Sequence, residues 1–213
     1  MKLRLYHYWR SSSSWRVRWA FSLKGIVCEF VAVNLLENQT ETPDHLRRNP
    51  MGFVPVLEFL DTPTNERHRY LAESTAIIEW AEEIQPQPSL LPGTPWERAR
   101  IRQLTQIINA GTQPLQNLGV NVLHSSDPIE QKRWNAYWTT QGLTAYEELV
   151  RETAGRFSFG DQLTLADLFL VPQCYNAGRQ EVSLEAFPTV LRIYENSKTL
   201  PSYAESAPER FQP

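Results

Sequence analysis

The first eighty residues alternate between two hydrophobic periods. Residues 3–6 alternate apolar and polar positions with a period of two, which is typical of a strand, and residues 28–35 are apolar and β-branched enough for a second strand. Between them, residues 15–24 place apolar side chains on one helical face, and Gly25 offers a natural helix end. Strand, helix and strand this close together predict a βαβ unit with two parallel strands.

A second group of short elements follows this unit. Pro55 opens a strand over residues 56–60, where a proline is tolerated, and residues 70–71 form another short apolar segment. The polar residues 61–69 between them predict a hairpin with a long connection. Ser74 is expected to cap a helix whose apolar positions follow i, i+3, i+4 spacing: Ala76, Ile77, Trp80, Ala81 and Ile84. With a loop or short helix before the hairpin, the order is β-α-β, α, β-β-α.

The pattern changes after residue 84. Residues 85–95 contain four prolines, a composition typical of a stiff linker. Beyond the linker the spacing predicts helices alone, over residues 96–110, 128–153, 165–177 and 188–199, with a short one near Pro201. The chain is therefore expected to combine an α/β domain at residues 1–84, a linker at 85–95 and an all-helical domain at 96–213.

A sharp local signal in the helical half is the segment from Leu163 to Leu168. Thr164 and Asp167 have the spacing of a capping box, and Leu163 and Leu168 stand where a hydrophobic staple would close. This pattern predicts a helix start with no chemistry of its own.

The composition of the chain argues against several classes of protein. With 41% apolar residues among 213, the chain can build a packed core, and two cysteines, Cys28 and Cys174, are too few for a disulfide framework or a zinc site. A net charge of −3 argues against a nucleic-acid binder. Neither a signal peptide nor a stretch of ~18 apolar residues occurs, so we expect a cytoplasmic protein without a membrane segment.

Several familiar catalytic patterns are absent from the sequence. It contains no Gly-x-Gly-x-x-Gly, no P-loop and no Gly-x-Ser-x-Gly elbow. Its histidines are isolated from one another, so no metal site is expected: His7, His45, His68 and His124.

What remains is a serine run, Ser11 to Ser14, between the first strand and the first helix. Backbone N–H groups, the helix dipole and serine hydroxyls favour an anion at this position, and a thiolate held there would have a lowered pKa. The alternative is that these serines only cap the helix.

Two further features stand at strand ends. A cis bond at Val54–Pro55 would expose the backbone of Val54 to an extended ligand, and Glu73 with Ser74 could hold an ammonium and a carboxylate at a helix N-terminus. Each has a plain structural alternative, namely a trans proline and simple capping. Together with the serine run, they describe a thioredoxin-like fold suited to an extended tripeptide that carries a carboxylate, an ammonium and a thiol.

At this point the sequence resembles a known family. Residues 10–18, Arg-Ser-Ser-Ser-Ser-Trp-Arg-Val-Arg, are similar to the Ser-Ser-Cys-x-Trp-Arg-Val-Arg signature of zeta-class glutathione transferases, whose best-known members are maleylacetoacetate isomerases. The resemblance spans nearly the whole chain, and continues through residues 49–55, 73–79, 113–118, 160–167 and 170–177.

The resemblance implies roles for individual residues. Ser11 would face the glutathione sulfur with Ser12 beside it, Val54 would bind the cysteinyl backbone, and Glu73 and Ser74 would hold the γ-glutamyl end. The remaining implied glutathione-binding residues are Ser13, Ser14, Trp15, Arg16, Gln113, Asn117, Leu118 and Gly119. Arg179, with Arg10 and Arg16 as further candidates, would face an acidic substrate.

Two departures from the family pattern stand within these motifs. Ser13 replaces the usual cysteine, and Glu73 replaces a frequent glutamine. The serine removes a thiol that modulates activity in relatives, whereas a glutamate at the second position is common in other glutathione transferases.

The family also implies a reaction, glutathione-dependent cis–trans isomerisation of maleylacetoacetate to fumarylacetoacetate in tyrosine and phenylalanine catabolism. Glutathione thiolate would add to the double bond, allow rotation and leave again. Alternatives are a maleylpyruvate isomerase, a broad glutathione transferase or dehalogenase, and a non-catalytic module that binds protein partners. A homodimer is implied as well.

Overall fold

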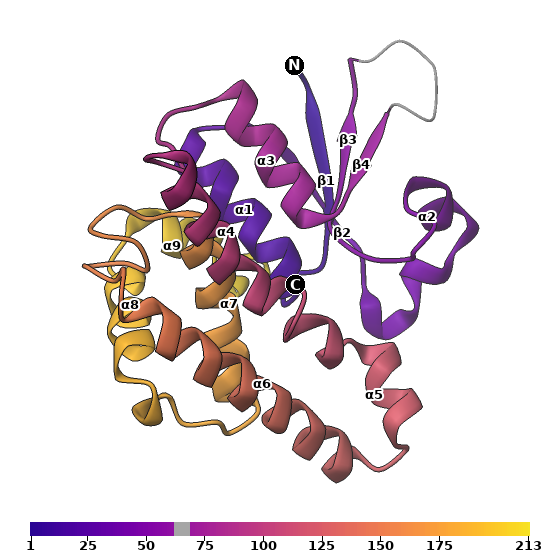
Figure 1. Cartoon of the computed structure of the whole chain (residues 1–213). Helices are drawn as coiled ribbons and strands as arrows, with labels where there is room; N and C mark the ends of the chain where they lie inside the picture. The colour runs from indigo at the N-terminus through magenta and orange to yellow at the C-terminus, as the bar shows by residue number, and fades with distance from the viewer. Residues whose placement is uncertain (62–68) are drawn as a thin grey trace. The chain divides into compact units, whose positions relative to one another are not determined.

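The computed structural model describes residues 1–61 and 69–213, which form two compact units (Figure 1). The first unit contains residues 1–88 and 201–213, and the second contains residues 89–200. The division falls inside the proline-rich stretch 85–95. The sequence placed residues 201–213 with the helical half, whereas in the structure they pack with the α/β unit.

The first unit is built on a four-stranded sheet in the order β2-β1-β3-β4. Strand β1 pairs in parallel with β2 and antiparallel with β3, and β3 pairs antiparallel with β4. These pairings confirm the predicted βαβ unit and hairpin; the residues 62–68 of the hairpin connection lie outside the described residues. The strands are β1 (Leu3–His7), β2 (Glu29–Ala32), β3 (Val56–Phe59) and β4 (Tyr70–Ala72).

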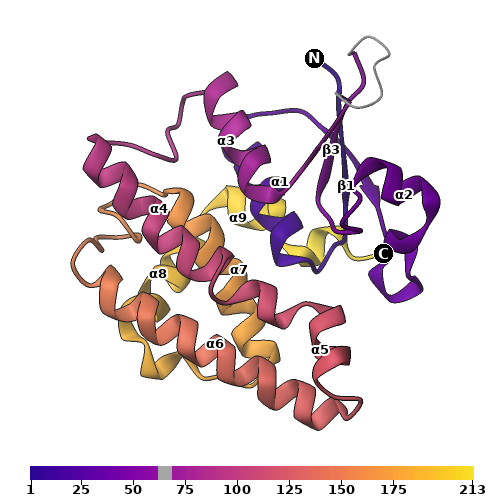
Figure 2. The same ribbon diagram turned by 45° about the vertical axis from the view of Figure 1, so that its right-hand side comes forward.

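Helices cover both faces of this sheet. Helices α1 (Ser12–Lys24) and α3 (Ser74–Ile84) lie on one face, and α2 (Pro43–Arg48) lies on the other (Figure 1 and Figure 2). Helix α1 ends at Gly25, whose φ of 63° only glycine adopts without strain, as the sequence predicted. The short helix α2 follows two 3-10 turns, η1 (Leu35–Glu37) and η2 (Gln39–Glu41).

The C-terminal residues complete the first unit. Helix α9 (Pro201–Ser206) and the turn η6 (Pro208–Phe211) pack along α1. Two buried tryptophans of α1 donate hydrogen bonds to serines of α9, Trp15 to the Ser206 hydroxyl at 3.1 Å and Trp19 to the Ser202 hydroxyl at 3.0 Å. Because these contacts join residues more than 180 positions apart, no local sequence pattern predicts them.

The second unit is helical, as predicted, with α7 packed against α4, α6 and α8. Helix α7 is apolar on nearly every side, and it begins at the predicted box, in which Asp167 Oδ2 accepts from the Thr164 amide at 2.7 Å. The sequence analysis missed α5. The helices of this unit are α4 (Pro95–Asn109), α5 (Leu118–His124), α6 (Pro128–Val150), α7 (Leu165–Arg179) and α8 (Pro188–Lys198), with the short turns η4 (Gln113–Gln116) and η5 (Leu184–Ala186).

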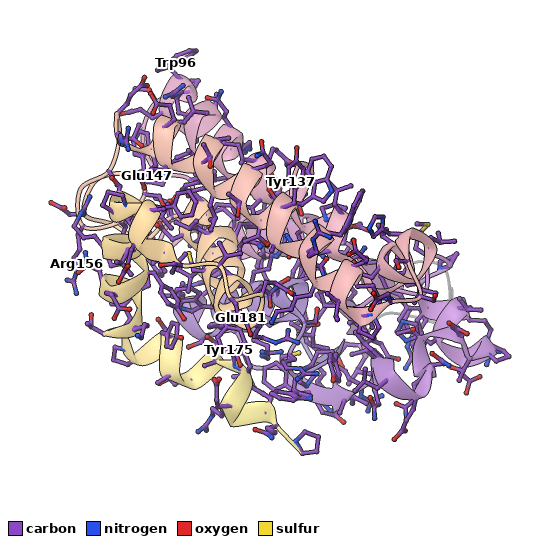
Figure 3. The ribbon with its side chains drawn as sticks, turned by 90° about the horizontal axis from the view of Figure 1, so that it is seen from below. Trp96, Tyr137, Glu147, Arg156, Tyr175 and Glu181 are labelled. Carbon is purple, nitrogen blue, oxygen red and sulfur yellow. The ribbon has the colours of Figure 1, made fainter. Side chains whose placement is uncertain are left out.

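Helix α8 receives its N-terminal cap from another helix. Phe187 stands at its N-cap position and offers no side-chain acceptor. Glu147, labelled on α6 in Figure 3, accepts instead from the amides of Thr189 at 3.2 Å and Val190 at 2.9 Å. This carboxylate satisfies donors that the start of a helix otherwise leaves unpaired.

None of the helices within residues 1–61 and 69–213 has the length and apolar character needed to cross a membrane.

Candidate functional site

Three of the predicted features meet at one end of the sheet in the first unit. Strand β1 ends there, antiparallel β3 begins there and β4 ends there, because Tyr6 pairs with Val56 and Val56 pairs with Ala72. The serine run follows β1, Val54 precedes β3 and Glu73 follows β4. The strand directions alone therefore bring together segments that are far apart in the sequence.

Ser11 is the N-cap of α1. Its backbone is extended, with φ −68° and ψ 122°, and its hydroxyl oxygen accepts from the Ser14 amide at 3.2 Å. A serine hydroxyl has two acceptor sites and one donor, so this cap leaves the O–H proton able to point at an anion. Capping and anion binding are thus compatible at Ser11, and the helix dipole favours negative charge at the same place.

The residues of the serine run differ in exposure. Ser11, Ser12 and Ser13 are half-buried, whereas Ser14 is fully buried and accepts from the Tyr8 amide at 3.4 Å. The indole of Trp15 is 1% exposed and packs beside Trp19 and Tyr203. Of the predicted glutathione-binding residues 11–16, only Ser11, Ser12 and Ser13 therefore have side chains that a ligand can reach.

Arg16 supplies a buried positive charge behind the serines. It is 1% exposed, and its Nη2 donates to the Ser13 hydroxyl at 3.3 Å. Burial lowers the pKa of Arg16 to about 9, and the carboxylate of Glu73 opposes this shift. Arg16 remains a cation at neutral pH, and it links the serine run electrostatically to the third feature.

The Val54–Pro55 peptide bond is cis, the arrangement that the sequence left open. Val54 itself is held in a small core cluster with Tyr6, Val33 and Val56. The carbonyl of the preceding residue, Phe53, accepts two hydrogen bonds, from His45 Nε2 at 3.0 Å and from Asn49 Nδ2 at 3.1 Å. These two supports were missed by the sequence analysis, because an isolated histidine on a short helix gives no signal of what its ring will contact.

The start of α3 differs from the expectation that Ser74 caps it. The N-cap is Glu73, whose side chain makes no capping bond, and Ser74 is the first helical residue and is buried. Glu73 has a φ of 67°, a left-handed value that costs a non-glycine residue roughly 1–3 kcal/mol. Because β4 turns directly into α3 here, the strained backbone leaves the Glu73 carboxylate exposed at the end of the sheet.

The remaining predicted residues lie in the second unit. Gln113 stands in η4 and donates from its Nε2 to Asn117 Oδ1 at 3.0 Å, and Leu118 and Gly119 begin α5 with Leu118 53% exposed. Two contacts from long helices hold this segment: Trp134 Nε1 to the Leu115 carbonyl at 2.7 Å, and Gln173 Nε2 to Gln116 Oε1 at 3.3 Å.

The predicted arginines belong to different units. Arg179 is the last residue of α7 in the second unit, and Arg10 precedes Ser11 in the first, where its guanidinium lies 4.9 Å from the ring centre of Trp9.

The protein's own thiols do not suit nucleophilic chemistry. Burial raises the pKa of Cys28 to about 12 and raises the pKa of Cys174 as well. Among the described residues, no group of His, Cys, Asp or Glu side chains could hold a metal ion. The hydroxyl at Ser11 and the buried cation at Arg16 fit a thiolate brought in on a ligand, with the exposed Glu73 carboxylate available for its ammonium group.

Comparison with known proteins agrees with this chemistry. The family model for the glutathione S-transferase N-terminal domain matches residues 5–89. Glutathione S-transferase Z2 of Arabidopsis thaliana is 40% identical over 98% of this chain and 92% of its own. Maleylacetoacetate isomerase of Mus musculus is 40% identical over 97% of this chain and 92% of its own.

The solved structures that are similar to this chain belong to the same group of enzymes as its sequence relatives. Maleylacetoacetate isomerase from Anaeromyxobacter dehalogenans, solved with glutathione in its active site, is similar with a TM-score of 0.89 and 47% identity over 100% of this chain and 97% of its own. The same enzyme was also solved with dicarboxyethyl glutathione and citrate in the active site. A zeta-class bacterial maleyl pyruvate isomerase in its holo form has a TM-score of 0.90 and 36% identity, over 99% of this chain and 98% of its own.

Proposed function

Because this chain belongs to the family of zeta-class glutathione transferases and maleylacetoacetate isomerases, we propose that it converts maleylacetoacetate to fumarylacetoacetate with glutathione. The observation that carries this proposal is the meeting of Ser11, Val54 and Glu73 at one end of the sheet. A hydroxyl, a strand start and a carboxylate at a helix N-terminus match the thiol, the peptide backbone and the γ-glutamyl ammonium of one tripeptide.

Each part of that site has a task. The Ser11 O–H donates to the sulfur, while the start of α1 and the Arg16 guanidinium favour its negative charge. The backbone of Val54 holds the cysteinyl residue, and Glu73 and Ser74 hold the γ-glutamyl end. Bound glutathione supplies the thiolate that adds reversibly to the cis double bond, which permits rotation about it.

The arginines are assigned to the carboxylates of the substrate. Guanidinium groups bind carboxylates through paired, charge-assisted hydrogen bonds and stabilise negative charge that develops next to them. Arg10 and Arg179 are the candidates, and the dicarboxyethyl glutathione bound to the A. dehalogenans enzyme supports a substrate with two carboxylates.

A test of this proposal separates the cap of Ser11 from its hydroxyl donor. Ser11→Ala loses both, whereas Ser11→Asp keeps an N-cap acceptor and has no hydrogen-bond donor. Loss of one hydrogen bond to a charged sulfur predicts a fall in kcat/KM of about 10- to 100-fold for both variants. Only the alanine variant should also lose about 1 kcal/mol of unfolding free energy. Isomerase activity that is independent of glutathione, or full activity in both variants, would refute the proposal.

The second candidate reaction is isomerisation of maleylpyruvate, which the structural likeness to a maleyl pyruvate isomerase favours. Turnover of maleylacetoacetate, maleylpyruvate and dichloroacetate, measured side by side at saturating glutathione, ranks the isomerases against a dehalogenase. A module that only binds protein partners would turn over none of the three. It would also show no rise in melting temperature with millimolar glutathione.

We extend the proposal to assembly and location. We expect a cytoplasmic homodimer, so sedimentation should give a particle of about twice 24.7 kDa. A species of 24.7 kDa at all concentrations would contradict the dimer.

A further inference from the structure

Arg18 is a charged side chain in the interior of the first unit. It lies on α1, about two turns after Ser11, and is 1% exposed. Burial lowers the pKa of Arg18 to about 9, with Glu209 opposing the shift, so the guanidinium is charged at neutral pH. A buried cation is costly unless its donors are engaged, and the partners of Arg18 show what it holds.

On one side Arg18 holds the loop that leads from β1 to Ser11. Its Nη1 lies 3.1 Å from His7 Nδ1 and 3.4 Å from the Tyr8 carbonyl, and its Nη2 donates to the Trp9 carbonyl at 3.0 Å. Three consecutive residues are thus bound by one guanidinium. Since an arginine can only donate, His7 Nδ1 accepts, which fixes the ring proton on Nε2.

On the other side the C-terminal segment, residues 201–211, holds Arg18. The Ser206 carbonyl accepts from Arg18 Nε at 3.0 Å, and the guanidinium lies 4.5 Å from the ring centre of Phe211. The Phe211 ring also meets the His7 ring edge-on at 5.3 Å. Four hydrogen bonds of the side chain are therefore directed either to the loop or to the end of the chain.

We propose that Arg18, clamped by the C-terminal segment through Ser206 and Phe211, is a positioning residue that sets where the Ser11 hydroxyl stands. This inference rests on the proposed function, in which Ser11 donates to the glutathione sulfur. Ser11 stands two positions after Trp9, and its own amide donates to the Tyr8 carbonyl at 3.1 Å, the same carbonyl that Arg18 contacts. A shift of Arg18 or Phe211 is therefore transmitted to Ser11 through one shared acceptor.

The clamp has a matched control within the same segment. Ser202 accepts from Trp19 and ties α9 to α1 through a hydrogen bond that does not involve the loop of His7, Tyr8 and Trp9. Ser202→Ala removes a hydrogen bond between α9 and α1 without touching the clamp. Arg18→Lys keeps the charge and loses the forked contacts, and Phe211→Leu keeps the apolar bulk and loses the ring.

The experiment measures the thiol pKa of bound glutathione from its thiolate absorbance, together with the pH profile of kcat/KM. We expect Arg18→Lys and Phe211→Leu to raise that thiol pKa, to move the rising limb of the profile to higher pH and to lower kcat/KM about 10- to 100-fold. In Ser202→Ala, the thiol pKa and the pH profile of kcat/KM should equal those of the wild-type protein. If Arg18→Lys does not fold, Phe211→Leu carries the test alone.

Two results would overturn the proposal: a wild-type thiol pKa in a folded Arg18→Lys or Phe211→Leu variant, or an equal shift in Ser202→Ala. Amide hydrogen exchange of residues 8–11 without ligand tests the clamp independently of catalysis. It should quicken in the two clamp variants and stay unchanged in Ser202→Ala; unchanged exchange in the clamp variants counts against the proposal. If the wild-type protein bound no glutathione, the proposed function would fail, while faster exchange in the clamp variants would still establish the clamp.

Discussion

Gly142 on α6 is a position where a single methyl group should have a large effect. A Cβ built there would lie 2.0 Å from Thr112 Oγ1, 2.7 Å from its Cγ2 and 2.9 Å from its Cβ. Thr112 is fully buried, and its hydroxyl donates to the Ile107 carbonyl at 2.8 Å. The side chain is short and branched, so it has no flexible end that could move aside.

The cost of Gly142→Ala follows from two opposing terms. Overpacking a filled core costs about 1–3 kcal/mol, and distances this short favour the upper end. Alanine in place of glycine within a helix returns up to ~1 kcal/mol. We therefore expect a net loss of about 2 kcal/mol, which corresponds to a fall in melting temperature of about 4–8 °C for a chain of this size.

Urea unfolding of four variants, Gly142→Ala, Gly178→Ala, Thr112→Gly and the double variant Thr112→Gly/Gly142→Ala, tests this reasoning. Gly178→Ala, also in a helix, meets no atom within 4 Å and should be neutral or stabilising by up to ~1 kcal/mol. Thr112→Gly combined with Gly142→Ala removes the clash, so the double variant should lose less than the sum of the two single changes. A Gly142→Ala protein as stable as the wild type, or strictly additive losses, would refute the close packing of Thr112 on α6.

Two further predictions concern groups that support other segments. Burial by itself raises the pKa of Glu147, but bonds from the Val190 and Thr189 amides and from Arg151 outweigh it and lower the pKa. The resulting stabilisation is complete above the ordinary value of 4.5 and is lost as the pH falls through the lower value of the folded protein. Glu147→Gln should cost about 1.5–3 kcal/mol at pH 7 and flatten the acid limb of a stability-against-pH curve; an unchanged limb would contradict the helix-capping role. For the loop before Val54, His45→Gln retains a donor for the Phe53 carbonyl, whereas His45→Phe does not. The phenylalanine variant should raise the KM for glutathione several-fold at nearly constant kcat, and equal KM values in both variants would show that this bond does not matter.

Much of the first unit could be predicted because its signals are local. The alternation at residues 3–6, the apolar face of residues 15–24 and the stop at Gly25 identify the βαβ unit without tertiary information. Once the strand directions are known, the meeting of Ser11, Val54 and Glu73 follows. The capping box at Thr164 and Asp167 could also be predicted, because its bonds join residues only three positions apart.

What the sequence could not reveal depends on distant partners. The sequence does not distinguish Arg18 from a solvent-exposed arginine, and part of what compensates its burial comes from the distant residues Ser206 and Phe211. Glu73, not Ser74, occupies the N-cap position of α3 and makes no capping bond, because the chain turns there from β4 with a left-handed backbone that capping preferences do not predict. Helix α5 is seven residues long and lies between polar residues. It is too short to show a periodic pattern in the sequence.

The return of the C-terminal segment to the first unit has a consequence for synthesis on the ribosome. All four strands have been made by Ala72, yet Ser202, Ser206 and Phe211, which cover Trp15, Trp19 and Arg18, come last. At translation rates of about 5–20 residues per second, the roughly 130 residues between Ala72 and Ser202 take about 6–26 s. During that interval Trp15, Trp19 and Arg18 of α1 lack the contacts that Ser202, Ser206 and Phe211 supply in the folded protein. The first unit is therefore completed only after residues 201–211 have been made, although its strands and first helix are made much earlier.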